Sequence, residues 1–147
     1  MNIVSDNRRG LHNYKIIDKY ECGIVLQGWE AKSARAKTVN LTNSYCFFRK
    51  NELFLYNANF KSYMLQKNDE NRERKLLLHK NELIRLNSKL NRLNSSTIIP
   101  VKLYFNNKNI VKLEIALVIG LTKKDKREEI KQKDQEKYIQ KIKNYLN

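Results

Sequence analysis

The sequence predicts a mainly β fold in which short antiparallel strands form a small closed or partly open barrel, flanked by two helices. The length of 147 residues suits one domain. Hydrophobic residues make up 41% of the chain, which is enough for a modest core. Short apolar runs of strand length alternate with Asn- and Gly-containing turns, and one segment has clear helical periodicity. This pattern fits a barrel of the oligonucleotide-binding kind, and a split β-sandwich fits nearly as well.

Residues 1–13 are polar and basic, and we expect a flexible arm there. Residues 14–26 read as a strand, because strand-forming Tyr, Ile, Val and Leu dominate the segment. Gly23 marks a bulge or bend within it. Gly28 then ends the strand.

Residues 29–36 have helical composition, with alanines among long charged side chains. Lys32 and Arg35 are three positions apart and therefore share one helix face. That face is suited to phosphate contacts, although a solvated surface is the commoner reason for such a pair.

The segments 44–49 and 53–60 are rich in aromatic and aliphatic residues, and Asn51-Glu52 between them indicates a tight turn, so we expect a hairpin. Residues 66–74 read as a polar loop. Residues 80–93 form the clearest helix, because leucines recur there at intervals of three, four and three. These leucines are Leu83, Leu86, Leu90 and Leu93.

Two further strands complete the predicted domain. Pro100 stands just inside the first strand, at a position compatible with an edge or a strand start, and alternating residues 101–105 continue it. Asn-rich residues 106–109 form the turn to the second strand, residues 111–117. Gly120 closes the domain, so we expect one barrel domain over residues 14–120.

Residues 121–147 form a separate basic tail. It contains nine Lys or Arg residues against five Asp or Glu, with a thin apolar stripe. Such a segment is marginal as an isolated helix. We expect it to be disordered when free and helical on its partner.

Lys and Arg number 30 against 15 Asp and Glu, a formal net charge of +15. This excess predicts a polyanionic partner, and nucleic acid is the first candidate. An anionic membrane is disfavoured because the tail lacks a broad apolar face. A Lys- and Asn-rich bias imposed by an AT-rich genome is the alternative explanation of the charge.

Nothing in the sequence indicates catalysis, a cofactor, a metal or a small-molecule substrate. His12 and His79 have no second ligand at metal-binding spacing, and the four glycines form no phosphate loop. Cys22 and Cys46 stand in apolar runs typical of buried thiols. The absence of a signal peptide and of a long apolar segment predicts a cytoplasmic protein. An RNA-processing enzyme is the alternative from another class.

Aromatic residues lie in or beside the predicted strands, where exposed rings can stack on bases. We expect most of these rings to be in the core, because alternation turns half of each strand inward. They are Tyr14, Tyr20, Tyr45, Phe47, Tyr56, Phe60, Tyr63 and Tyr104.

Several segments resemble one known family in order along the chain. The motifs are Asn7-Arg8-Arg9 with His12, the G-x-E-x-K-S-x-R-A segment at 28–36, Asn40 with Ser44-Tyr45, R-K-L-L-L-H-K at 74–80, V-x-L-Y-F at 101–105 and D-K-R at 125–127. Together they resemble the small protein B (SsrA-binding protein) family. The sequence departs from the family pattern at Gly10, Leu11, Asn43, Leu121-Thr122 and Lys124.

The resemblance implies an oligonucleotide-binding-type barrel that grips the tRNA-like domain of transfer-messenger RNA. It also implies delivery of that RNA to stalled ribosomes for trans-translation, with the tail probing the decoding centre and the empty mRNA channel. The residues expected to contact RNA are Glu21, Lys32, Arg35, Arg74, Lys75, Leu77 and His79. Those expected to contact small-subunit rRNA at the decoding centre are Asp125, Lys126 and Arg127. A barrel that binds tRNA or rRNA generically, without a rescue role, is the alternative.

Overall fold

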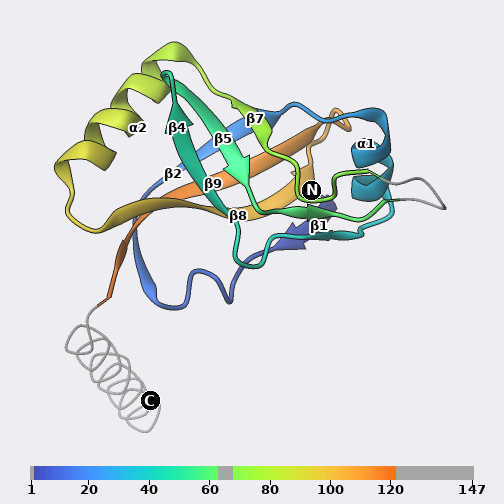
Figure 1. Cartoon of the computed structure of the whole chain (residues 1–147), viewed down its shortest axis with the longest axis horizontal. Coiled ribbons are helices and arrows are strands. Elements are labelled where there is room, and N and C mark those ends of the chain that lie inside the picture. Colours follow the sequence, from blue (N-terminus) through green and yellow to red (C-terminus); the bar gives the residue numbers. More distant parts are fainter. Residues whose placement is uncertain (1, 63–67, 122–147) are drawn as a thin grey trace, which may run out of the picture.

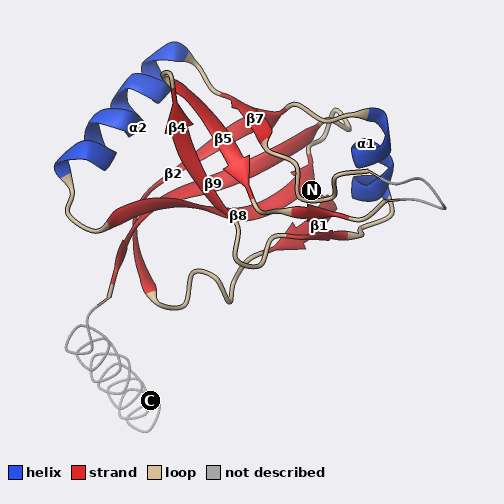
Figure 2. Ribbon diagram, in the orientation of Figure 1, coloured by secondary structure: helices blue, strands red, loops and turns tan. Residues whose placement is uncertain are grey.

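The computed structural model describes residues 2–62 and 68–121. Nine strands and two helices occur in these residues (Figures 1 and 2). In chain order they are β1 (Asn2–Asp6), β2 (Tyr14–Ile24), α1 (Gly28–Arg35), β3 (Val39–Asn40), β4 (Tyr45–Arg49), β5 (Glu52–Tyr56), β6 (Asn59–Phe60), β7 (Arg74–Leu77), α2 (Lys80–Arg92), β8 (Ser96–Phe105) and β9 (Val111–Gly120).

The larger sheet closes on itself. Its antiparallel pairings run β8–β4–β5–β7–β2–β9 and return to β8, because β8 pairs with β4 on one side and with β9 on the other. β1 pairs with the far half of β8, and β3 and β6 form a separate two-stranded sheet. The predicted fold, mainly antiparallel β with flanking helices, is confirmed, and the ring of pairings distinguishes it from a split sandwich.

The two helices lie at opposite ends of the ring (Figure 1). Leu86 of α2 is fully buried, and the neighbouring leucines of the predicted apolar stripe pack against the same core. In α1, Ala34 is fully buried against the other end. Neither described helix is long and apolar enough to span a membrane.

The β4–β5 hairpin is the clearest case of local sequence determining local structure. Lys50 and Asn51 both have positive φ, and Arg49 pairs directly with Glu52. Two left-handed residues match the right-handed twist of the flanking strands, and Asn tolerates that conformation well. The turn lies one residue earlier than the sequence indicates.

Residues 2–6 form a strand, where the sequence predicts a flexible arm. Val4 is 7% exposed and is the one residue of this strand that packs into the core. Because a single buried residue produces no alternating pattern, the sequence does not reveal the strand. The backbone N–H of Asn7 continues the attachment by donating to the carbonyl of Val101 at 2.8 Å. The prediction for the tail lies outside the described residues from residue 122 onward.

Pro100 lies in the middle of β8 rather than at its start. The pairing of β8 with β9 shifts register between Pro100 and Lys102, so the missing N–H falls at an irregularity. The carbonyl of Pro100 accepts a hydrogen bond from Nδ2 of Asn7 at 2.9 Å. A bulge of this kind allows proline inside a long strand.

Candidate nucleic-acid interface

Three residues predicted to contact RNA, far apart in the sequence, meet in one surface hollow. Glu21 comes from β2, Leu77 from the end of β7, and His79 from the residue before α2. The hollow has a volume of about 380 Å³. Its lining residues are Glu21, Gly23, Leu77, Leu78, His79, Glu82 and Lys112, and we call it the β2–β7 hollow.

Strand register builds the floor and walls of this hollow. Gly23 pairs with Leu77 on one side and with Lys112 on the other, so the three residues form one row across β7, β2 and β9. Gly23 contributes no side chain, and a Cβ added there would lie 3.4 Å from the Cβ of Leu77. Leu77 is 52% exposed, which makes it an apolar wall open to solvent rather than a core residue.

Glu21 lies two residues before Gly23 and therefore on the same face of β2. Its carboxylate Oε2 accepts a hydrogen bond from the hydroxyl of Tyr104 on β8. Tyr104 is only 3% exposed, and this burial, together with the hydrogen bond to Glu21, raises its pKa far above the ordinary value. Tyr104 therefore remains a donor at any physiological pH, and it holds Glu21 in place.

His79 is fixed at the beginning of α2. Its backbone N–H donates to the Glu82 carboxylate at 3.2 Å, and its carbonyl accepts the first helical hydrogen bond from Leu83 at 3.0 Å. Together His79 and Glu82 form a capping box at the start of α2. The imidazole is left exposed beside the hollow.

Lys32, Arg35 and Lys75 do not line the hollow. Lys32 and Arg35 are exposed on α1. Lys75 is half-buried on β7, and its Nζ lies 3.2 Å from a carboxylate oxygen of Glu52. Their expected phosphate contacts stay predictions.

Arg74, by contrast, is fully buried between β7, α1 and β6 and does not face solvent. Its Nε–H donates to Glu30, and its guanidinium lies over the ring of Phe60, 4.1 Å from the centroid. Its other donors serve the backbone carbonyls of Ala58, Arg72 and Glu70, at 2.9, 2.8 and 3.0 Å. The expectation of an RNA contact at Arg74 is therefore corrected to a structural role.

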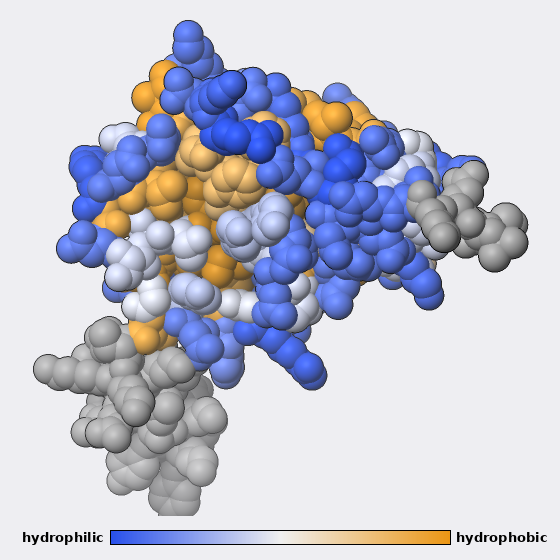
Figure 3. All heavy atoms as spheres, in the orientation of Figure 1, coloured by the Kyte–Doolittle hydropathy of each residue, from blue (hydrophilic) through white to orange (hydrophobic). Residues whose placement is uncertain are grey.

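The aromatic residues divide between core and surface. Phe60 and Tyr104 are buried, whereas Tyr45 and Tyr56 are each 41% exposed on the outer face of β4 and β5. Their ring centroids are 5.2 Å apart, and Phe47 and Phe54 extend the cluster. The face seen in Figure 3 carries hydrophobic patches bordered by hydrophilic residues. Tyr63 lies outside the described residues.

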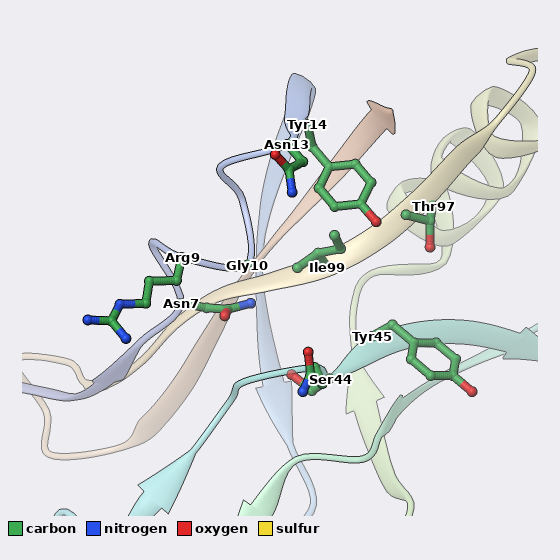
Figure 4. A pocket seen from close by; sticks show the side chains of 10 residues that line it. Asn7, Arg9, Gly10, Asn13, Tyr14, Ser44, Tyr45, Thr97 and Ile99 are labelled. Atoms are coloured by element: carbon green, nitrogen blue, oxygen red, sulfur yellow. The ribbon is translucent and has the colours of Figure 1, made fainter. Parts of the chain in front are cut away.

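A second hollow, of about 570 Å³, lies where the turn before β2 meets β4 and β8 (Figure 4). Asn7 is 4% exposed there, and a Cβ on Gly10 would lie 2.4 Å from its Oδ1, so a larger residue at that position would have to displace the Asn7 side chain. The backbone N–H of Leu121 donates to the carbonyl of Asn13 at 3.0 Å, which places the start of the tail beside this hollow. Sequence reasoning missed the hollow, because it depends on the unexpected attachment of residues 2–7.

Comparison with known proteins yields consistent matches over the whole barrel. The family model described as SmpB protein matches residues 4–145. The SsrA-binding protein of Mycoplasmopsis fermentans is 66% identical over 142 residues, covering 97% of each chain. That of Mycoplasmopsis agalactiae is 64% identical over 147 residues, covering 99% of this chain and 100% of the relative.

More distant relatives and a solved structure agree. The SsrA-binding protein of Nitratiruptor sp. is 46% identical over 138 residues, covering 90% of this chain and 91% of the relative. A chain of the structure described as "tmRNA-SmpB: a journey to the center of the bacterial ribosome" is similar with a TM-score of 0.67 and 39% identity. That likeness covers 86% of this chain and 93% of the other.

Proposed function

The chain belongs to the SmpB family, and from this premise we propose that it binds transfer-messenger RNA and delivers it to stalled ribosomes for trans-translation. It acts as a cytoplasmic RNA-binding adaptor without catalytic activity. Its partners are the tRNA-like domain of that RNA and the small ribosomal subunit.

The observation that carries the proposal is the convergence of Glu21, Leu77 and His79 in the β2–β7 hollow. The hollow offers an acceptor, an apolar wall and an exposed imidazole within one site. RNA-binding proteins read unstacked loop bases with this combination of stacking and edge contacts. The basic surface of a chain with a net charge of +15 supplies sequence-independent attraction to the phosphates.

The two ends of β2 support simultaneous contact with two RNAs. Gly23 lies in the β2–β7 hollow near the end of the strand, whereas Tyr14 at its start lines the second hollow and pairs with Gly120, just before the tail. Nine residues of strand span about 30 Å. A bound tRNA-like domain at one end therefore leaves the tail at the other end free to reach the ribosome.

In this proposal Asp125, Lys126 and Arg127 contact rRNA at the decoding centre. Their assignment comes from the D-K-R motif of the family, and all three lie outside the described residues. The two cations suit rRNA phosphates, since neutralised phosphates release counterions. The carboxylate suits the N-cap of a helix that forms in the mRNA channel.

A competition titration tests the proposal. The full chain is titrated with the tRNA-like domain of transfer-messenger RNA, in the presence of bulk tRNA, across a salt series. We expect a preference for the tRNA-like domain that survives at about 0.15 M salt, where purely electrostatic affinity has fallen by orders of magnitude. A chain that shows no preference is a generic tRNA- or rRNA-binding barrel, and the rescue role is then rejected.

Leu77→Ala provides the variant for this titration, with Ile84→Ala as its matched control. Both side chains are exposed aliphatic residues, 52% for Leu77 and 58% for Ile84, but Ile84 lies on α2 outside the β2–β7 hollow. We expect Leu77→Ala to reduce the preference and Ile84→Ala to leave it unchanged. Equal effects of the two variants would place RNA recognition elsewhere on the barrel.

A further inference from the structure

We propose that the β2–β7 hollow reads the hydrogen-bond-donating edge of one unstacked guanine base, and that Tyr104 is the positioning residue that holds Glu21 for this contact. The inference rests on the proposed function, which makes the hollow an RNA site. Beyond that function, it names the chemical class of base that the hollow selects. It also assigns a role to Tyr104, which does not touch the RNA.

The charge of the hollow argues against a phosphate ligand. The chain as a whole carries a net charge of +15, yet the lining of the hollow contains two carboxylates, Glu21 and Glu82, against one ammonium, Lys112. Glu114 pairs with Glu21 across β2 and β9, but its carboxylate lies 3.7 Å from Nζ of Lys19, so this pair adds no net charge to the neighbourhood. A phosphate placed among these groups would be repelled, whereas a donor-bearing edge would be attracted.

The Glu21 carboxylate uses part of its hydrogen-bonding capacity within the protein and has acceptor positions left for a ligand. Within residues 2–62 and 68–121, the hydroxyl of Tyr104 is its one hydrogen-bond partner, and it occupies Oε2. An ionised carboxylate only accepts hydrogen bonds and has about four lone-pair positions. Its remaining positions require donors from the ligand.

Guanine is the base whose edge meets this requirement best. Its N1–H and its 2-amino group are adjacent donors, and together they match the two oxygens of a carboxylate. Adenine and uracil present an acceptor beside each donor, so one of their groups would face Glu21 unfavourably. Leu77 supplies an apolar surface for the ring, and the missing side chain of Gly23 leaves room for it.

Tyr104 acts through Glu21 and not by contact with RNA. Tyr104 is 3% exposed, and on β8 it pairs with Lys112 of β9, the same strand whose Glu114 pairs with Glu21. Loss of its hydroxyl would free the Glu21 side chain to rotate away and would leave the fold intact. Tyr20 and Asp18 form a comparable tyrosine–carboxylate pair that serves as a control: the Tyr20 hydroxyl donates to Oδ2 of Asp18 at 3.1 Å. Neither residue of that pair lines the hollow.

The test compares Tyr104→Phe, Tyr20→Phe, Glu21→Gln and the Tyr104→Phe/Glu21→Gln double variant. Affinity for the tRNA-like domain is measured over a salt series, and a thermal melt checks each fold. We expect Tyr104→Phe to weaken binding about tenfold, in keeping with a hydrogen bond to a charged group, and Tyr20→Phe to have no effect. The salt dependence stays unchanged, because no phosphate contact is lost. Tyr104→Phe adds nothing to Glu21→Gln.

The base is identified by replacing each unpaired guanosine of the RNA in turn with inosine, which lacks the 2-amino group. We expect one position to weaken binding to the wild-type chain and not to the Glu21→Gln variant. Glu21→Gln binding more tightly than wild type would show that the carboxylate faces phosphate and would overturn the proposal. Additive effects of the two variants, or no sensitive guanosine, would do the same.

These outcomes are separable from failure of the proposed function. If the wild-type chain shows no preference for the tRNA-like domain over bulk tRNA, the rescue role fails. The coupling of Tyr104 to Glu21 and the inosine effect are then measured on bulk tRNA, where they still support or overturn the guanine site.

Discussion

Arg74 and Glu30 form an ion pair in which neither side chain is exposed to solvent. The pair joins β7 to α1, and Arg72 adds a second contact to the same carboxylate at 2.5 Å. Burial raises the pKa of Glu30, but the hydrogen bonds from Arg72 and Gln27 and the charge of Arg74 outweigh it, so the pKa lies below the usual range. Glu30 is therefore ionised at neutral pH and depends on its partners.

Arg74→Ala should destabilise the fold strongly, because the buried Glu30 carboxylate would lose the positive charge and the hydrogen bond that Arg74 supplies. Breaking one partner of a buried pair typically costs about 3–5 kcal/mol. Arg49→Ala is the control, since Arg49 pairs with Glu73 at 2.8 Å on the surface, where such pairs contribute up to about 1 kcal/mol. Urea unfolding measures both. Equal effects of the two variants on the free energy of unfolding would contradict the structural role of Arg74.

The same pair shows where sequence reasoning reached its limit. Arg74 follows a run of charged residues and is the first residue of the R-K-L-L-L-H-K motif, so the sequence predicts a surface cation there. Its burial depends on partners that are distant in sequence, Glu30 and Phe60, and no local periodicity reveals such a network. The α2 leucine stripe and the β4–β5 hairpin were predictable because local spacing and turn chemistry determine them. Leu77 stands in the apolar run Leu76-Leu77-Leu78, where local spacing does not separate core from surface positions, and strand register places it beside Gly23.

Cys22 should be unreactive in the folded protein. Burial raises the pKa of its thiol to about 12, and burial also raises the pKa of Cys46 well above the ordinary value. Only the thiolate reacts with disulfide reagents, so labelling with an aromatic disulfide at about pH 8 should be slow. The same chain in urea, where both thiols are exposed, serves as the control. Native labelling as fast as in urea would show that the barrel opens readily around these residues.

The ion pair of Asp18 with Lys89 should make stability depend on acid pH. Lys89 Nζ lies 2.5 Å from Oδ2 of Asp18, and this hydrogen bond is the main reason why the pKa of Asp18 lies below its usual value of 3.8. A lowered folded-state pKa gives a contribution that is complete above about pH 3.8 and is lost as pH falls through the folded value.

Asp18→Asn should therefore be modestly less stable than the wild-type chain at pH 7, and the difference should vanish toward pH 2. Urea unfolding of both proteins at the two pH values measures it, with Asp6→Asn as the control for an exposed aspartate outside this contact. A difference that is the same at both pH values would show that the Asp18 effect is not electrostatic.

Gly23→Ala should weaken RNA binding without unfolding the barrel. The added Cβ meets Leu77 at 3.4 Å, an ordinary contact distance, but it fills the floor on which a base would rest. Loss of one base-stacking contact costs about 1–3 kcal/mol of binding free energy. Gly28→Ala is the matched control, because a Cβ there meets nothing within 4 Å. Unchanged affinity of Gly23→Ala for the tRNA-like domain would exclude a ring seated over Gly23.

Replacing Asp125, Lys126 and Arg127 together with alanine should separate RNA binding from ribosome rescue. The β2–β7 hollow and the start of the tail lie at opposite ends of β2, so affinity for transfer-messenger RNA should be retained. Peptide tagging on stalled ribosomes should be abolished, because the decoding-centre contacts are removed. The control replaces Lys131, Lys133 and Asp134 with alanine, which changes the net charge of the tail by the same amount. Tagging in a reconstituted translation reaction measures both, and a 125–127 variant that tags as well as the control would refute the decoding-centre assignment.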